Sequence, residues 1–445
     1  MRRHGLFDAR VPRYTSYPTA NHFTDGVGPD EMAAFLSNLP SDERISLYIH
    51  IPFCRRLCWF CACRTQGTAT ASPVRSYVET LKREIALIRE RLPDGVELSR
   101  LHWGGGTPTL LEADVITDLA ETIRDAFPMG EGAEFSVEID PNEIDDARLD
   151  ALAAAGLNRA SIGVQDFDPD IQAIIGRDQS FDVTKRAVDG LRARGIDSLN
   201  VDILYGLPNQ TQARISDSVQ RVLSLSPDRI ALYGYAHVPW MARRQALIPT
   251  DLLPRPEERL ALFDTAARLF RWDGYSTIGI DHFAKPTDGL AVALDEGRLR
   301  RNFQGYTDDG APTLIGLGAS SISRFPGGYA QNAPATSKWA GAVGAGDLAT
   351  SRGVLMTRDD HIRAAAIEML MCEFQIDVSR AAERAKVDVS EVQALLPALL
   401  EAFPDAVEAT ATGLRIRPET YPLTRIIAKS LDAWEVKAKG HSLAF

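Results

Sequence analysis

Four of the five cysteines in this 445-residue chain lie within ten residues, in the stretch IPFCRRLCWFCACRTQG. Cys54, Cys58, Cys61 and Cys63 give the spacing C-x3-C-x2-C-x-C, directly after the apolar run ISLYIHIP. Thiols at such spacings can form disulfides, bind zinc or hold an iron–sulfur cluster. This segment, the cysteine loop (residues 51–67), therefore constrains the fold more than any other part of the chain.

The amino-terminal stretch MRRHGLFDAR starts basic but has no apolar core and no small-residue cleavage site, so we predict no signal peptide. No run of 18 apolar residues is present, which predicts no transmembrane helix and no membrane partner. We therefore expect a cytoplasmic protein, in a reducing compartment where structural disulfides are rare. The net charge of −11 argues against nucleic-acid binding but leaves room for local arginine clusters that hold acidic small molecules.

The spacing favours an iron–sulfur cluster over zinc. Structural zinc sites commonly use two separated ligand pairs, whereas this chain has no second cysteine pair and its eight histidines show no close pairing. Closely spaced thiolates on a short loop suit a soft iron–sulfur cluster, and zinc remains the alternative. If Cys54, Cys58 and Cys61 hold three irons of a [4Fe–4S] cube, the fourth iron is free to bind a ligand that is not protein.

From about residue 45 the sequence alternates between short β-rich runs and amphipathic helical segments. The predicted strands are residues 45–52, 97–105, 134–140, 159–165, 198–206, 229–236 and 275–283. The clearest helix has Ser72 as its N-cap and Pro73 at its first position, followed by an apolar stripe that extends to Leu92. Other helices are expected near 112–127, 181–195, 211–226 and 256–271. Repeated strand–helix units predict an α/β fold with a parallel sheet.

Unusual polar and glycine-rich clusters follow the carboxyl ends of six consecutive predicted strands: CRRLCWFCAC, GGGTPT, DPNE, QDFDP, YGLP and AHVPW. Chemistry from so many strands fits a barrel, complete or partial, better than an open sheet with one crevice. We predict a partial (β/α)6-type barrel over 44–285, with an N-terminal arm, 1–43, and a Gly/Ala-rich extension, 286–355. A mostly helical C-terminal domain, 356–445, should contain one strand at 413–418.

The motif C-x3-C-x2-C just after the first strand resembles the signature of radical S-adenosylmethionine (SAM) enzymes. The stretches YIHIPFCRRLCWFCAC, LHWGGGTPT, SVEIDPNE, SIGVQDF, NVDILYGLP, GYAHVPW, PRYTSYPTA and RNFQGYT together resemble the oxygen-independent coproporphyrinogen III oxidases. The resemblance covers essentially the whole chain from about Pro12 and implies a radical SAM barrel with a [4Fe–4S] cluster. In this family SAM chelates the open iron, and an electron from the cluster cleaves SAM to methionine and a 5′-deoxyadenosyl radical.

The resemblance also implies the reaction. The radical would abstract a hydrogen from the β-carbon of a propionate, and loss of CO2 and one electron would leave a vinyl group. Two such steps would convert coproporphyrinogen III to protoporphyrinogen IX in porphyrin and haem biosynthesis. A donor of the flavodoxin or ferredoxin type would reduce the cluster, a second SAM would bind nearby, and the protein would be a monomer. The N-terminal arm would close the active site, and the 286–355 extension would contribute to the substrate site.

Residue roles follow from the matching motifs. Cys54, Cys58 and Cys61 would bind the cluster, and Cys63 would line the site near the substrate or a second SAM as the catalytic candidate. Contacts with SAM are implied for Tyr48, Phe60, Ala62, Gly105, Gly106, Thr107, Glu138, Gln165, Arg177, Asp202, Ala236 and Ile322. Of these, Gln165, Arg177, Asp202 and Ala236 match positions used for the second SAM. Ala62 stands where the family often has glycine, and its methyl group should be tolerated beside the cofactor.

Several of these residues have simpler alternatives. Cys63 could be a fourth cluster ligand, Asp202 could form a buried salt bridge with a neighbouring arginine, and Ile322 could be a core residue. Glu138 lies in an otherwise apolar strand, where a charge is costly unless it is paired. The glycine run GGGTP lacks a following Lys-Ser/Thr, so it does not match a phosphate-binding P-loop.

Two arginines are candidates for binding substrate carboxylates. Arg13 lies in the aromatic arm segment PRYTSYPTA, and Arg301 lies in RNFQGYT. A guanidinium group can bind a propionate through two parallel hydrogen bonds. The fifth cysteine, Cys372, lies among apolar residues of a predicted helix and is expected to be a buried structural thiol.

Two other functions fit the same motifs. One is a haem-binding or haem-trafficking radical SAM relative without oxidase activity, and the other is a radical SAM enzyme that methylates or degrades haem. Haem-binding relatives typically lack the fourth cysteine and the PRYTSYP arm. Both features are present here, which counts against the first alternative.

Overall fold

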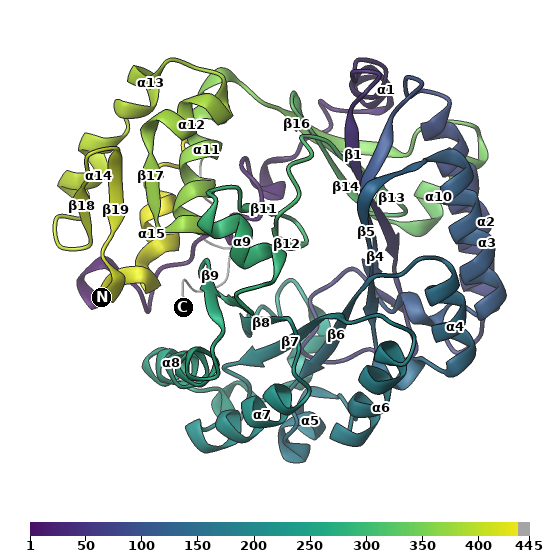
Figure 1. The fold of residues 1–445 in the computed structure, drawn as a ribbon, viewed down its shortest axis with the longest axis horizontal. Coiled ribbons are helices and arrows are strands. Elements are labelled where there is room, and N and C mark those ends of the chain that lie inside the picture. The colour runs from purple at the N-terminus through teal and green to yellow at the C-terminus, as the bar shows by residue number, and fades with distance from the viewer. Residues whose placement is uncertain (435–445) are drawn as a thin grey trace.

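A twelve-stranded curved sheet organises the molecule, which is described over residues 1–434 by a computed structural model (Figure 1). In spatial order its strands are β16 (Thr350–Leu355), β15 (Gly328–Asn332), β14 (Ile322–Phe325), β13 (Leu314–Leu317), β1 (Arg44–Ile51), β4 (Glu97–Gly105), β5 (Met129–Ile139), β6 (Arg159–Gln165), β7 (Ser198–Tyr205), β8 (Arg229–Gly234), β10 (His282–Ala284) and β9 (Ser276–Ile278). The strands from β13 to β8 are all parallel. Over residues 1–434 the two edges do not pair, so the sheet is an incomplete barrel, as predicted.

Helices cover the outer face of the sheet (Figure 1). They are α2 (Ser72–Arg89), α3 (Ala113–Ala126), α4 (Asp146–Ala154), α5 (Pro169–Ile175), α6 (Phe181–Arg192), α7 (Gln212–Ser224) and α8 (Pro256–Trp272). The predicted apolar stripe of α2 is buried against β1, whose Ile45, Leu47 and Ile49 are almost fully covered. The helix begins at Ser72 itself, so Ala71 rather than Ser72 is the N-cap. Burial of these alternate strand positions leaves the other positions of each strand facing the barrel interior.

The run 275–283 does not form a further parallel strand. It folds into the short strands β9 and β10, which pair antiparallel to each other, while β10 pairs antiparallel to β8. Gly279 lies between them with a φ of 52°, a left-handed conformation that favours glycine and turns the chain. The prediction of one continuous strand was therefore wrong at this end of the sheet.

The Gly/Ala-rich segment 286–355 contains regular structure that the sequence pattern did not predict. It forms α9 (Gly289–Asp295), the hairpin of β11 (Arg300–Asn302) and β12 (Gly305–Thr307), the strands β13 to β16, and α10 (Thr336–Gly344). β13 adds a seventh parallel strand beside β1, and β14 to β16 continue as an antiparallel meander. These strands are only four to six residues long, which leaves too few residues for a clear periodic signal.

A buried carboxyl group connects this extension to the barrel. Glu84 of α2 is 3% exposed, and it accepts hydrogen bonds from the Gly318 amide at 2.7 Å and the Asn332 side chain at 2.6 Å. Burial raises the pKa of Glu84 to about 7, against the opposing effect of these hydrogen bonds. The folded state therefore holds this proton more tightly than the unfolded chain does.

We expect Glu84 to make stability depend on pH. The folded-state pKa of Glu84 exceeds the unfolded value of 4.5. The free energy of unfolding should therefore fall as the pH rises above about 4.5, and the loss should reach about 3 kcal/mol above about pH 7. The Glu84→Gln variant should lose this part of the pH dependence of stability. Thermal unfolding of both proteins across this range measures the difference, and parallel curves for the two proteins would contradict the assignment.

The two ends of the described chain pack together in a second core. Helices α11 (Arg358–Glu373), α12 (Val378–Ala385), α13 (Val389–Gln393), α14 (Leu396–Ala402) and α15 (Thr424–Lys429) surround a small sheet of β17 (Gln375–Asp377), β19 (Gly413–Ile416) and β18 (Val407–Ala409). The strand expected at 413–418 is thus present as β19. Leu6, Val11, Tyr14 and Tyr17 of the arm belong to this core, and the N-terminus lies beside β18 and β19 (Figure 1).

The remaining elements are α1 (Pro29–Ser37), which follows the first part of the arm, and the short pair β2 (Phe53–Cys54) and β3 (Gln66–Gly67) at the cysteine loop. The last eleven residues of the expected C-terminal domain, 435–445, lie outside the described residues. Among residues 1–434, no helix combines the length and the apolar character needed to cross a membrane.

Candidate active site

The cysteine loop is fixed at both ends beside the carboxyl end of β1. Its flanks pair as β2 and β3, the Gln66 amide donates to the Pro52 carbonyl at 2.7 Å, and the Trp59 amide donates to the Ile175 carbonyl at 2.9 Å. Its four cysteines are free thiols. All four line one cavity of about 380 Å³, which we call the cysteine cavity.

The four thiols differ in their electrostatic surroundings. Burial raises the pKa of Cys54 to about 11. Burial also raises the pKa of Cys58, although the Arg177 guanidinium, 3.6 Å from its sulfur, opposes the shift. The hydrogen bond with Cys63 lowers the pKa of Cys61 to about 6. Metal binding requires thiolates, so a bound cation would have to deprotonate Cys54 and Cys58.

Within residues 1–434, no three His, Cys, Asp or Glu side chains converge in the way that a single metal ion requires. The thiols of Cys54, Cys58 and Cys61 nevertheless share one cavity and influence one another electrostatically. Closely spaced thiols of one short loop around a common space are the donors that iron–sulfur clusters use. The donor set therefore fits a [4Fe–4S] group.

The sequence GGGTP (residues 104–108), which we call the glycine loop, lies at the end of β4 and packs directly on the start of the cysteine loop. The Gly106 amide donates to the Ile51 carbonyl at 2.9 Å, and the Thr107 amide donates to the Phe53 carbonyl at 2.7 Å. A Cβ atom on Gly106 would lie 2.4 Å from the Phe53 carbonyl oxygen, which is backbone and cannot rotate away. Gly105 has a φ of 111°, so its conformation also favours glycine. The glycines are thus required by close backbone approach, and both line the cysteine cavity.

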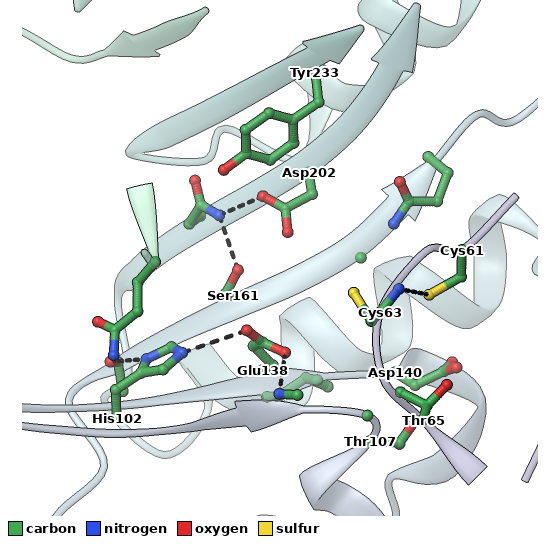
Figure 2. A pocket seen from close by; sticks show the side chains of 18 of the residues that line it. Cys61, Cys63, Thr65, His102, Thr107, Glu138, Asp140, Ser161, Asp202 and Tyr233 are labelled. Carbon is green, nitrogen blue, oxygen red and sulfur yellow. Dashed lines mark hydrogen bonds and ion pairs between the residues drawn. The ribbon is translucent and has the colours of Figure 1, made fainter. Parts of the chain in front are cut away.

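Glu138 lies near the end of β5 and faces the cavity (Figure 2). It accepts a hydrogen bond from the Gly105 amide at 3.0 Å, and its other oxygen lies 3.4 Å from Nε2 of His102. Burial would raise the pKa of Glu138, but the His102 contact and the Gly105 amide hold it below the usual range. The carboxylate is therefore charged at neutral pH, and its side chain is still 41% exposed to the cavity.

Tyr48 lies behind this part of the wall. Its hydroxyl is 3.0 Å from Nδ1 of His50, and its ring stacks on that of His102 with centroids 5.7 Å apart. Burial raises the pKa of Tyr48 well above its usual value, and the Glu138 carboxylate adds to the shift. The hydroxyl is therefore neutral and acts here as a hydrogen-bonding group that orients the histidines.

A second polar group lies on the neighbouring strands. Gln165 ends β6 in a left-handed conformation with a φ of 70°, at a break in the pairing register with β7. Such strained positions often occur at ligand sites. Arg177 donates to the Gly163 carbonyl at 2.6 Å and lies 3.6 Å from Asp140. Both Gln165 and Arg177 line the cysteine cavity.

Asp202 of β7 points into the same space as Glu138 (Figure 2). It accepts a hydrogen bond from the Asn200 side chain at 2.9 Å, and it forms no ion pair with Lys or Arg among the described residues. The alternative of a buried salt bridge is therefore wrong. Burial raises the pKa of Asp202 to about 6, partly offset by the Asn200 hydrogen bond.

The remaining candidates occupy different places. Phe60 and Thr107 line the cysteine cavity, as Cys63 does. Ala62 instead lines a neighbouring space on the other side of the cysteine loop. The Ala236 carbonyl accepts a hydrogen bond from the Gln245 side chain at 3.0 Å. Ala236 lines a different cavity, which Arg13 and Arg301 also line.

Two further residues lie in apolar surroundings. Ile322 of β14 is half-buried and packs against a cluster of Phe23, Tyr329 and Val354, away from the cysteine cavity. Cys372 of α11 is fully buried in an apolar cluster with Ile278. The expectation of a buried thiol at Cys372 is therefore confirmed.

Several residues that line the cysteine cavity were missed from the sequence. They are His102, Ser136, Ser161, Asn200, Tyr233, Arg244 and His282. Asn200 stands two positions before Asp202, and Ser136 stands two positions before Glu138. Alternate residues of a strand share a face, so the period of two could have found both. Arg244 gave no such signal because it lies in a 3-10 turn far along the chain.

Comparisons with known proteins add independent findings. A family profile described as the radical SAM superfamily matches residues 48–222. An oxygen-independent coproporphyrinogen III oxidase of Paracoccus denitrificans (strain Pd 1222) is 60% identical over 444 residues, which cover 100% of this chain and 98% of that protein. The protein of the same name from Bradyrhizobium diazoefficiens is 41% identical, over 96% of this chain and 95% of its own.

A solved structure shows the same similarity in three dimensions. Coproporphyrinogen III oxidase (HemN) from Escherichia coli, described as a radical SAM enzyme, superposes with a TM-score of 0.90 at 37% sequence identity. The match covers 95% of this chain and 98% of that chain.

Proposed function

The chain belongs to the oxygen-independent coproporphyrinogen III oxidases of the radical SAM superfamily, and from this premise we propose that its substrate is coproporphyrinogen III. The reaction is the oxidative decarboxylation of two propionate groups to vinyl groups, which gives protoporphyrinogen IX without oxygen. The observation that carries the proposal is the cysteine cavity, where the four thiols of the cysteine loop, the glycine loop and the carboxylates of Glu138 and Asp202 meet.

Cys54, Cys58 and Cys61 are the residues that hold the [4Fe–4S] cluster in this proposal, and Cys63 remains beside it as a residue of the substrate side. When bound, the cluster and SAM together supply a 5′-deoxyadenosyl radical, an oxidant strong enough to take a hydrogen atom from the propionate β-carbon. The barrel excludes water from this space and fixes the positions of the groups around it.

The first SAM is bound by the glycine loop and Glu138. Gly105 and Gly106 allow a ligand to approach the backbone closely, and the charged Glu138 carboxylate suits the ammonium group of a methionine moiety. Thr107 and Phe60 complete this side of the cavity, while Tyr48 acts through the histidines that it contacts.

A second SAM lies against Gln165, Arg177 and Asp202 in this proposal. The support is the Asp202 carboxylate, which faces the cavity without a cationic side chain as partner and suits ribose hydroxyl groups or a sulfonium. Ala236 offers its carbonyl on the wall of the adjacent cavity. Neither Ile322 nor Ala62 lines the cysteine cavity, so this proposal gives them no direct contact with SAM there.

We expect the second SAM to depend on Asp202 and on pH. Because the pKa of Asp202 is about 6, a ligand that requires the charged carboxylate should bind about fourfold more tightly at about pH 7 than at about pH 5.5. The Asp202→Asn variant should bind one SAM rather than two, with a flat pH profile. Equilibrium dialysis with radiolabelled SAM measures both quantities, and two equivalents bound by the variant would contradict this role.

The function is tested by an anaerobic assay with reconstituted cluster, SAM, a chemical reductant and coproporphyrinogen III. We expect two CO2 and one protoporphyrinogen IX per substrate. Tight haem binding without CO2 release would instead favour the haem-trafficking alternative, and S-adenosylhomocysteine as product would favour a methyltransferase. A colourless protein that carries stoichiometric zinc would exclude all three radical SAM functions.

We further propose that a reduced flavodoxin or ferredoxin supplies the electron and that the protein acts as a cytoplasmic monomer. Its net charge of −11 supports the expectation of no nucleic-acid partner. Replacement of the chemical reductant by each purified carrier in the same assay tests the donor, and light scattering of the active protein tests the monomer.

A further inference from the structure

A second cavity, of about 550 Å³, adjoins the cysteine cavity. It lies where the arm, the carboxyl ends of β7 and β8, helix α8 and helix α15 meet. The wall between the two spaces consists of consecutive residues: Tyr233 and His282 line the cysteine cavity, whereas their neighbours Gly234 and Asp281 line the second one. The Tyr233 hydroxyl and Nε2 of His282 are 3.4 Å apart. One layer of side chains therefore separates the second cavity from the candidate radical site.

The second cavity is strongly basic in a protein that is acidic overall. Six arginines and two aspartates line it, a surplus of four positive charges: Arg10, Arg13, Arg259, Arg271, Arg301, Arg425, Asp264 and Asp281. We call it the arginine cavity. The whole chain carries a net charge of −11, so this concentration of guanidinium groups requires a local explanation.

Two of these arginines carry buried nitrogen atoms without hydrogen-bond partners. They are Nε of Arg259 and both Nε and Nη1 of Arg301, whose side chain is only 5% exposed. Nη1 of Arg301 lies 3.8 Å from Asp281, beyond hydrogen-bond distance. A buried donor without an acceptor destabilises the fold, so these atoms point to an acceptor that the protein itself does not supply.

The cations also destabilise one another. Burial and the nearby Arg13 lower the pKa of Arg259, and burial together with Arg13 lowers the pKa of Arg425 to about 9. Asp281 is the carboxylate near Arg301. Burial would raise the pKa of Asp281, but Arg301 and His282 hold it low. An anionic ligand would relieve the repulsion among the arginines.

Apolar surfaces complete the cavity. Phe263 of α8 and the exposed ring of Trp240 line it, and Tyr421 stacks on Phe374 with ring centroids 3.8 Å apart. An apolar wall interrupted by guanidinium groups matches a ligand that has a large apolar body and several carboxylates on its rim.

We propose that the arginine cavity binds the porphyrinogen through its propionate carboxylates, with Arg259 and Arg301 as the principal anchors. The inference rests on the proposed function and adds a basis for specificity. Coproporphyrinogen III has four carboxylates and its product has two. Each decarboxylation therefore weakens the electrostatic attraction between the cavity and the bound ring. The cavity thereby favours the substrate over the product and promotes release of the finished molecule.

The experiment measures binding of coproporphyrin III and protoporphyrin IX, the stable oxidised forms, to the full-length protein by fluorescence quenching. We expect the unaltered protein to bind the tetracarboxylate at least about tenfold more tightly than the dicarboxylate. The Arg259→Met variant should weaken coproporphyrin binding about tenfold and reduce this ratio. The matched control is Arg268→Met, an exposed arginine on the same helix that does not line the cavity, and it should change neither value.

Unchanged coproporphyrin affinity in Arg259→Met, or equal affinities of the unaltered protein for the two porphyrins, would overturn the inference. If Arg259→Met does not fold, Arg259→Lys keeps the charge without the two-pronged geometry and should give an intermediate affinity. Failure of the proposed function is seen separately, as absence of CO2 release by the unaltered protein. The ratio of porphyrin affinities still decides the inference in that case, because binding does not require turnover.

Discussion

Replacement of Cys58 by serine should leave the protein without its iron–sulfur absorbance and reduce oxidase activity by more than about a hundredfold. Removal of a residue that merely supports a metal ligand costs about 10–100-fold, and loss of one of three direct ligands should exceed this. Cys58 lies in the cysteine loop next to Arg177, whose guanidinium is 3.6 Å from the sulfur. The pairing of β2 at Cys54 and the Trp59 hydrogen bond fix the loop on both sides of Cys58, so another thiol could take its place only if the loop moved.

The chain supplies its own control for this variant. Cys63 lies two residues after Cys61 and lines the same cavity, so Cys63→Ser changes the same atom type in the same loop. We expect this protein to keep four irons and four sulfides but to lose activity. Iron and sulfide analysis with electron paramagnetic resonance, with and without SAM, separates the two outcomes. A full cluster in Cys58→Ser, or none in Cys63→Ser, would reverse the assignment of ligands.

The Gly106→Ala substitution should be the most damaging single-methyl change in the site. The new Cβ would lie 2.4 Å from the Phe53 carbonyl oxygen and 2.9 Å from the Ile51 carbonyl oxygen. Both are backbone atoms, so the glycine loop must move away from the cysteine loop and weaken the hydrogen bonds that join them. Such overpacking costs about 1–3 kcal/mol, and a displacement near 1 Å at a reacting site can reduce the rate about a hundredfold.

The matched control is Gly341→Ala. Gly341 lies within α10, and a methyl group added there would meet no atom from outside its own helix turn within 4 Å. Alanine should therefore be tolerated at this position with a small gain in stability. Melting temperature and SAM affinity measured on both variants distinguish a local distortion from general instability. Normal SAM binding and activity in Gly106→Ala would show that the close backbone approach is not required.

The part of the fold that the sequence predicted best is the part where burial imposes a simple period. Strand β6 is buried on alternate positions, and α2 buries the apolar stripe that runs from Val74 to Ile88. Glu138 and Asp202 could also be singled out, because each is a carboxylate within an otherwise largely apolar strand. The roles given to these residues came from resemblance to a family, and they remain predictions that the variants above test.

Other features had no local signal. The short strands β13 to β16 are defined by pairing with β1 and with one another rather than by a pattern of their own. The arginine cavity is the clearest example, since Arg13, Arg259 and Arg425 come from the arm, α8 and α15 and meet only in the folded molecule. Arg259 and Arg425 look like ordinary surface arginines in the sequence, whereas Arg13 was a candidate only through the motif that surrounds it.

The pairing of the arm with the last helices has a consequence for how the protein is made. Leu6, Val11 and Tyr14 find their apolar partners on α11 to α15, and Arg425 donates to the Pro12 carbonyl at 3.0 Å. The arm is synthesised before these partners, with the whole barrel between them. The arginine cavity is thus completed only after helix α15 has been synthesised, because Arg425 forms part of its wall.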